Sequence, residues 1–205
     1  YAHMMLAVIT SMVVSMFVGT NHQLVEFFFT GVMKWVVVFA PIAAVFVVAP
    51  VLANDPSPPV AMAALHGFAA LMGLSFAVIF VIYTMGSIFT AFMGAAVLFG
   101  TMSCYGYFTK QSLDSLGKYL FVGLIAIVIA SIVNVFVGSS LATMVISAIA
   151  ILIFLGLTAY DTQKIREMVS YDSSPATEVA GALTLYLDFI NIFLNLLSLF
   201  GGRKD

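Results

Sequence analysis

The chain has 205 residues, of which 63% are hydrophobic and 8% are charged, and its formal net charge is −2. Soluble proteins carry roughly 25% charged residues, so this composition, with a mean hydropathy of +1.16, excludes a soluble domain and indicates an integral membrane protein. The weak negative charge argues against a nucleic-acid partner. The single cysteine, Cys104, excludes an intramolecular disulfide and a cysteine metal cluster. We therefore expect one membrane domain, residues 1–205, whose main partner is the lipid bilayer.

Seven apolar stretches are each long enough to cross a bilayer, for which about 20 residues suffice. In chain order, they cover residues 2–19, 31–53, 60–84, 87–109, 118–138, 141–163 and 182–200. They are apolar on all sides, which predicts helices rather than the alternating strands of a barrel. The sequence therefore predicts an all-α integral membrane protein with seven transmembrane helices.

Small and proline residues within the spans suggest how the helices pack. Gly94, Gly100, Gly123 and Gly156 offer small surfaces for close helix contacts. Pro41 and Pro50 lie inside the second span and are expected to kink it.

The basic residues give a weak indication of topology. With seven crossings, the N-terminal side holds four of them and the opposite side three: Lys110, Lys118, Lys164 and Arg166 against Lys34, Arg203 and Lys204. The positive-inside rule then favours a cytoplasmic N-terminus. If the last helix re-enters instead of crossing, the Arg203-Lys204 tail would lie inside as well.

The last span has a stripe of polar side chains on one helical face. Its members follow one another at spacings of 4, 3, 4 and 3: Thr184, Asp188, Asn191, Asn195 and Ser198. Such a seam should face protein or water rather than lipid. We therefore expect the last helix to be central, with other helices around it, and the stripe to form a polar seam or pore lining.

Asp161 and Asp188 both lie in apolar surroundings, where an ionised carboxylate is costly. Their helices are consecutive and antiparallel, and both residues lie within about two turns of the connecting loop, so they are expected to meet. Two touching carboxyl groups hold one proton more readily than none, which makes a pH-operated latch or a transient oxygen site for Ca²⁺. Alternatively, Asp161, with Thr158 one turn before it, is an interfacial acid in water, and Asp188 is a protonated acid bonded to Asn or Thr.

Three other polar residues are accessory candidates. His66 is the histidine of the third span; it titrates near neutrality or simply hydrogen-bonds to a helix neighbour. Glu26 and Lys34 flank the second span and are interpreted mainly as interface anchors.

Two segments together resemble the signature of the Bax inhibitor-1 family, bacterial branch. They are Ala-Tyr-Asp-Thr-Gln at 159–163 and the run from Ala182 to Leu194 around Asp188. The similarity continues through residues 34–41 and 103–110 and runs essentially end to end. Members usually have a short polar stretch before the first span, so we expect this chain to lack its native N-terminus.

The resemblance implies a seven-helix bundle whose short last helix is surrounded by the other six. It also implies a pH-sensitive Ca²⁺ leak in the bacterial inner membrane, with Asp161 and Asp188 as the pH sensor, Ca²⁺ as the transported ion, H⁺ as the regulator and no tightly bound cofactor. Some members have a basic residue within the second span that engages the acidic pair. Here that span has only Lys34, near its start.

Two alternatives remain open. Spans one to five have few polar residues for a hydrophilic pore, which favours a regulator of a membrane protease or a stress pathway without transport. The resemblance implies that such a protease would be membrane-anchored and ATP-dependent. Paired aspartates also suggest an intramembrane aspartyl protease, and Tyr160-Asp161 resembles half of the presenilin signature. However, Asp188 lacks the Gly-x-Gly-Asp context. With no NTP-binding loop or nucleophile triad, we expect no enzyme.

Overall fold

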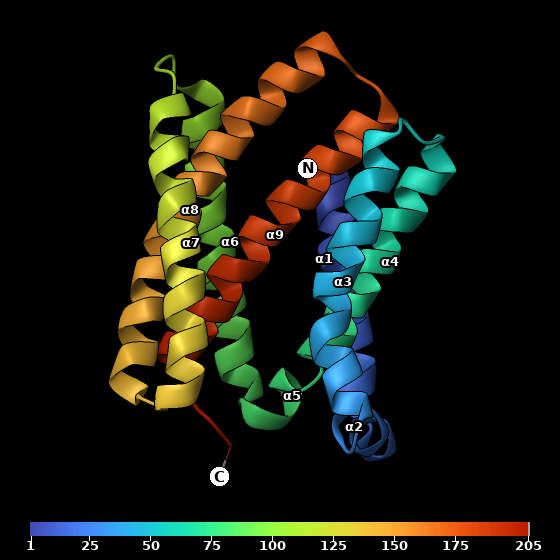
Figure 1. The fold of residues 1–205 in the computed structure, drawn as a ribbon, viewed down its shortest axis with the longest axis vertical. Coiled ribbons are helices and arrows are strands. Elements are labelled where there is room, and N and C mark those ends of the chain that lie inside the picture. The colour runs from blue at the N-terminus through green and yellow to red at the C-terminus, as the bar shows by residue number, and fades with distance from the viewer. Residues whose placement is uncertain (205) are drawn as a thin grey trace. The chain divides into compact units, whose positions relative to one another are not determined.

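The computed structural model describes residues 1–204, and nearly all of them are helical (Figure 1). The helices are α1 (Ala2–Gly19), α2 (His22–Phe29), α3 (Met33–Ala53), α4 (Pro58–Phe76), α5 (Ile79–Ile82), α6 (Met85–Phe108), α7 (Asp114–Val137), α8 (Ser140–Tyr171) and α9 (Pro175–Phe200). Seven segments are long and apolar enough to cross a membrane: α1, α3, α4 with α5, α6, α7, α8 and α9. The predicted all-α fold with seven transmembrane helices is confirmed.

The largest differences from the sequence prediction are at α2, at the end of α8, which continues to Tyr171, and at the start of α9. α2 lies in the predicted first loop, where the Asn21 side chain caps it by accepting from the backbone N–H groups of Gln23 and Leu24 at 3.1 and 3.3 Å. α9 begins at Pro175 rather than at residue 182 and has 26 residues. The prediction of a short last helix is therefore wrong. The stretch between the predicted spans 141–163 and 182–200 is mostly helical, because Lys, Arg and Glu favour helices even where they are too polar for a bilayer.

A tight turn separates α8 from α9. The Asp172 carboxylate accepts hydrogen bonds from the Thr177 hydroxyl at 2.6 Å and from the Ser174 backbone N–H at 3.0 Å. These bonds, Thr177 first, hold the pKa of Asp172 below its ordinary value. Pro175 then occupies the first helical position, where its missing N–H is not needed. The turn is therefore fixed by its own side chains.

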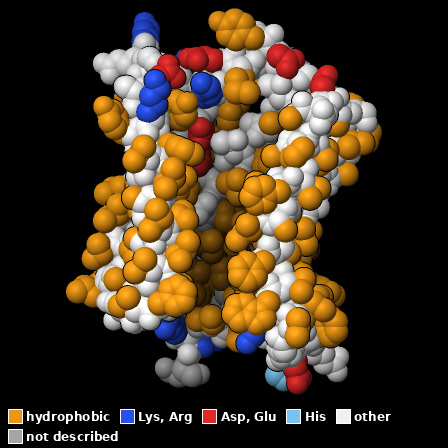
Figure 2. All heavy atoms as spheres, viewed as in Figure 1, with side chains coloured by type: hydrophobic (Ala, Val, Ile, Leu, Met, Phe, Trp, Pro, Cys, Tyr) orange, Lys and Arg blue, Asp and Glu red, His pale blue; other side chains and the backbone are white. Residues whose placement is uncertain are grey.

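The described chain divides into two compact units. The first contains Tyr1–Met85, Met168–Tyr186 and the residues Arg203 and Lys204, and the second contains Gly86–Glu167 and Leu187–Gly202. α9 is continuous and contributes its first half to one unit and its second half to the other. Figure 2 shows hydrophobic side chains along the helices and charged side chains gathered near helix ends. That the chain is one membrane domain with a central last helix stays a prediction.

In the first unit, α4 packs between α1 and α3. Gly73 of α4 faces the α1 backbone so closely that an added Cβ would lie 2.5 Å from the Ser11 carbonyl oxygen. The Ser11 hydroxyl lies 2.9 Å from the Ala69 carbonyl oxygen, to which it donates, and 2.6 Å from the Tyr186 hydroxyl. A chain of hydrogen bonds therefore connects α4, α1 and the first half of α9.

A hydrogen bond between helices compensates for the first proline of α3. Pro41 has no N–H, so the Val37 carbonyl loses its usual partner within the helix. The Ser75 hydroxyl of α4 donates to this carbonyl at 2.6 Å. At membrane depth a backbone carbonyl needs such a partner from the protein itself, so Ser75 both satisfies α3 and holds it against α4.

In the second unit, α8 contacts α6, α7 and the second half of α9. Gly106 of α6 meets α8 closely, because an added Cβ would lie 2.8 Å from the Ala159 Cα. The predicted packing role of glycine is confirmed at three positions, where Gly94, Gly123 and Gly156 face Leu196, Ile153 and Leu120. It is wrong at Gly100, where an added Cβ would meet nothing within 4 Å. Whether a helical glycine faces a neighbour or open space depends on helix rotation, which composition does not reveal.

Replacing Ser75 with alanine should lower the free energy of unfolding in micelles by about 1–3 kcal/mol, because the Val37 carbonyl loses its donor. Titration with sodium dodecyl sulfate, followed by circular dichroism, measures this. In the Pro41→Ala background the helix regains its own N–H donor, so Ser75→Ala should cost less. Equal costs in the two backgrounds would show that Ser75 does not compensate for the proline.

Gly106→Ala should lower the melting temperature in detergent, since overpacking costs about 1–3 kcal/mol and the atoms it meets belong to the α8 backbone. Gly100→Ala on the same helix is the matched control. It should be neutral or stabilising by about 0.4–1 kcal/mol, because it only restricts the unfolded chain. If the two variants melt alike, α6 and α8 do not approach as closely as described here.

Candidate functional site

The structure brings Asp161 of α8 and Asp188 of α9 together in the second unit. Their carboxyl groups are in side-chain hydrogen-bonding contact. Asp188 is only 4% exposed, and Asp161 is half-buried. Two carboxyl groups in such contact need a proton between them, because two anions would repel and neither could donate. One shared proton would satisfy a contact of this kind.

Asp188 lies in a strongly apolar section of α9. The next residue, Phe189, packs edge-to-face on Phe92 and Phe99 of α6, with ring centroids 5.3 and 5.7 Å apart. The Oδ2 atom of Asp188 is buried and has no hydrogen-bond partner among the described residues. An acceptor left unpaired in such surroundings costs free energy, and an ionised one costs more. The environment therefore favours the proton-holding form of the pair.

Three close contacts fix the segment of α8 that contains Asp161. Ala159 lies against Gly106, and the Tyr160 ring lies over Gly117 of α7. Gln163, 6% exposed, donates from Nε2 to the Gln111 carbonyl at 2.9 Å and accepts from the Leu113 N–H at 2.8 Å. These contacts are made by residues before and after Asp161 in α8, and together they fix its position. Sequence reasoning missed Gln163, although it is a polar residue within the 159–163 signature.

Basic side chains lie near the end of α8. Lys164 is close enough to Asp161 to act on it electrostatically, and its Nζ lies 5.9 Å from the centre of the Tyr160 ring. Arg166 donates to the Tyr107 carbonyl and stacks on the Tyr107 ring at 5.7 Å. Within residues 1–204, neither forms an ion pair with Asp161 at 4 Å or less. The acidic pair is thus influenced by a cation without being neutralised by one.

The polar stripe of α9 is largely satisfied by its own helix. The Asn191 and Asn195 amides donate to the carbonyls four residues earlier, both at 2.8 Å. Thr184, which is in the half of α9 that belongs to the first unit, donates to its own helix at Ala180, and on α8 the buried Thr158 donates to Phe154. Ser198 instead meets Ser147 of α8 at 3.2 Å. The role of these residues as a pore or polar seam stays a prediction.

The accessory candidates all make their described contacts in the first unit. The His66 Nδ1 atom lies 2.9 Å from the Thr10 hydroxyl of α1, so its partner is on another helix rather than on its own. Glu26 is exposed on α2, and Lys34 is exposed at the start of α3 with its Nζ 5.3 Å from the centre of the Trp35 ring. The role of Glu26 and Lys34 as interface anchors stays a prediction.

Acidic, histidine and cysteine side chains are not clustered in threes in the described part of the chain. Among the described residues, no group of three or more His, Cys, Asp or Glu side chains is placed to hold a metal ion. Ca²⁺ takes six to eight oxygen ligands, and two carboxyl groups that share a proton offer fewer. A Ca²⁺ ion at the pair would therefore keep much of its water and stay only briefly.

The chain matches a protein family over its whole length and individual relatives over much of it. A family model described as "Inhibitor of apoptosis-promoting Bax1" matches residues 1–205. Inner membrane protein YbhL of Escherichia coli (strain K12) is 46% identical over 143 residues, which are 67% of this chain and 61% of that protein. A Deinococcus radiodurans protein described as uncharacterized is 41% identical over 170 residues, 81% of this chain and 73% of the relative.

A Rickettsia prowazekii protein, also described as uncharacterized, is 42% identical over 142 residues, 67% of this chain and 60% of its own length. The chain thus spans about three fifths of YbhL and of the Rickettsia protein. The match of the family model over all 205 residues, together with seven membrane-spanning helices, shows that this chain belongs to the Bax inhibitor-1 family.

Proposed function

We propose that this protein is a Ca²⁺ leak channel or transporter of the bacterial inner membrane, gated by protonation of Asp161 and Asp188. The observation that supports it is the contact between two acids from consecutive membrane helices, one of them 4% exposed. The name of the similar YbhL protein supports the inner membrane. The four basic residues near the helix ends that share a side with the N-terminus support a cytoplasmic N-terminus: Lys110, Lys118, Lys164 and Arg166.

The gate follows from the charge states of the pair. With one proton shared, the two carboxyl groups attract, and α8 and α9 are held together. Without it, two unit charges about 4 Å apart repel by about 4 kcal/mol at an effective dielectric constant of about 20. That energy changes an equilibrium between closed and open states about 1,000-fold. Loss of the proton therefore opens the contact and presents oxygens that attract a passing hydrated Ca²⁺ ion.

Asp188→Asn should abolish the pH dependence of Ca²⁺ flux. The asparagine amide donates to the Asp161 carboxylate at every pH, so the contact stays closed and flux stays low. In wild type, flux should rise as the pH increases through the range from about pH 5 to pH 8, where a buried acid can titrate. Uptake into dye-loaded proteoliposomes measures this, with Asp161→Asn tested beside it.

Asp114→Asn is the matched control, because Asp114 is an exposed acid of the same unit whose side chain bonds only locally to Ser112 at 2.9 Å. It should keep the wild-type pH profile. The mechanism fails if Asp161→Asn and Asp188→Asn both retain the pH dependence of the wild type.

The second candidate function is a regulator that binds a membrane-anchored ATP-dependent protease without transporting anything. The observation that favours it is α7: no residue of its most apolar stretch is buried within the structure. A helix with an apolar surface on all sides can contact a partner helix as well as lipid. Absence of flux above empty liposomes at every pH, together with co-purification of a membrane protease, would favour this function over the channel.

A further inference from the structure

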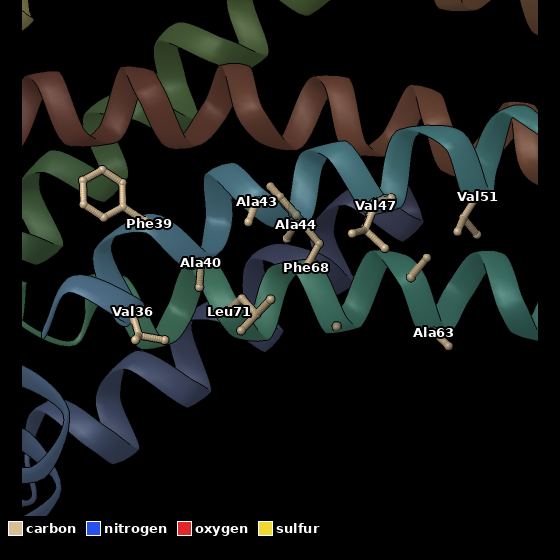
Figure 3. A pocket seen from close by; sticks show the side chains of 13 residues that line it. Val36, Phe39, Ala40, Ala43, Ala44, Val47, Val51, Ala63, Phe68 and Leu71 are labelled. Carbon is tan, nitrogen blue, oxygen red and sulfur yellow. The ribbon is translucent and has the colours of Figure 1, made fainter. Parts of the chain in front are cut away.

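An apolar groove of about 690 Å³ runs between α3 and α4 of the first unit (Figure 3). Only valine, alanine, glycine, phenylalanine and leucine line it, from Val36 to Val51 on α3 and from Ala63 to Leu71 on α4. Small residues leave space in the groove, since an added Cβ at Gly67 would meet nothing within 4 Å. The groove is therefore an unfilled apolar surface on two membrane-spanning helices.

The groove is long enough for a lipid chain of one leaflet. Val36 and Val51 are separated by 15 positions of one helix, which corresponds to about 22 Å at a rise of 1.5 Å per residue. One leaflet of the hydrocarbon core is about 15 Å thick, half of about 30 Å. An acyl chain of one leaflet can therefore lie along α3 and α4 within the groove.

Aromatic rings connect the groove to a cation. Phe39 lines the groove, and its ring stacks with that of Trp35 at 6.1 Å. The Lys34 Nζ lies 5.3 Å from the centre of the Trp35 ring. Tryptophan and lysine at the end of a span are typical of the headgroup level. Lys34 is exposed, and within residues 1–204 no carboxylate lies within ion-pair distance of it.

We propose that the α3–α4 groove binds one acyl chain of an anionic phospholipid and that the lipid phosphate lies against Lys34. The apolar walls bury the chain, and the unpaired ammonium group attracts the phosphate. An anionic headgroup is thereby preferred to a zwitterionic one, whose own cation competes with Lys34.

The test is native mass spectrometry of the detergent-purified protein with added phosphatidylglycerol or phosphatidylcholine. Wild type should retain one phosphatidylglycerol molecule per chain. Gly67→Leu fills the groove and should lose this lipid, whereas Gly100→Leu, at the open position of α6, should keep it. Ala44→Leu fills the groove from α3 and serves as the second variant if Gly67→Leu is not monodisperse.

The headgroup contact has its own pair of variants. Lys34→Gln should bind phosphatidylglycerol about fivefold more weakly, the effect of one basic residue at a membrane surface, and should bind phosphatidylcholine as wild type does. Lys118→Gln should change neither. Unchanged lipid retention in both groove-filling variants would overturn the proposal. A change of oligomeric state without loss of lipid would overturn it in favour of a second copy of the chain.

Discussion

Within a bilayer, helices find hydrogen-bond partners only in the protein, since hydrocarbon offers none, and this constraint explains most of the polar contacts described here. The Val37 carbonyl, which Pro41 leaves without a donor, receives the Ser75 hydroxyl of the neighbouring helix. The side-chain amides of Asn191 and Asn195 donate to backbone carbonyls of their own helix. Ser11 and Tyr186 satisfy each other. These polar groups are thus tolerated in the spans because each of them has a definite partner.

Asp188 is an exception to that rule. Tyr186, two residues earlier on α9, is fully buried and hydrogen-bonded, whereas the Asp188 Oδ2 atom has no partner within residues 1–204. The contact of this carboxyl group with Asp161 depends on a proton. A membrane protein that needed only stability would be better served by an apolar residue here. The buried acid and its conditional contact therefore support the proposal that this pair responds to pH.

The sequence predicted the spans well because bilayer thickness alone sets their length, and it placed Asp161 and Asp188 together because consecutive antiparallel helices match depths around one loop. It missed α2 and the early start of α9, since polar residues such as Lys164 and Glu178 mark the end of a membrane span but not the end of a helix. It also missed the partners of Gln163 and Ser75. Which side chain reaches a given carbonyl depends on helix rotation. A period of 3.6 residues shows which residues share a face of a helix, but not which neighbouring helix that face meets.

The first unit has two apolar features, the lipid-facing surface of α3 and the groove between α3 and α4. The sequence predicts the first but not the second. A run of valines and alanines indicates that α3 faces hydrocarbon, and any lipid-exposed helix would show such a pattern. The groove arises only because α3 and α4 are held together at Ser75 while small residues, including Gly67, leave space between them. Hydrocarbon in such a space is surrounded by protein on more than one side and lies beside a lysine at headgroup depth. A lipid bound in the groove therefore contacts two helices at once, unlike bulk lipid. The sequence of one helix alone does not predict such a site.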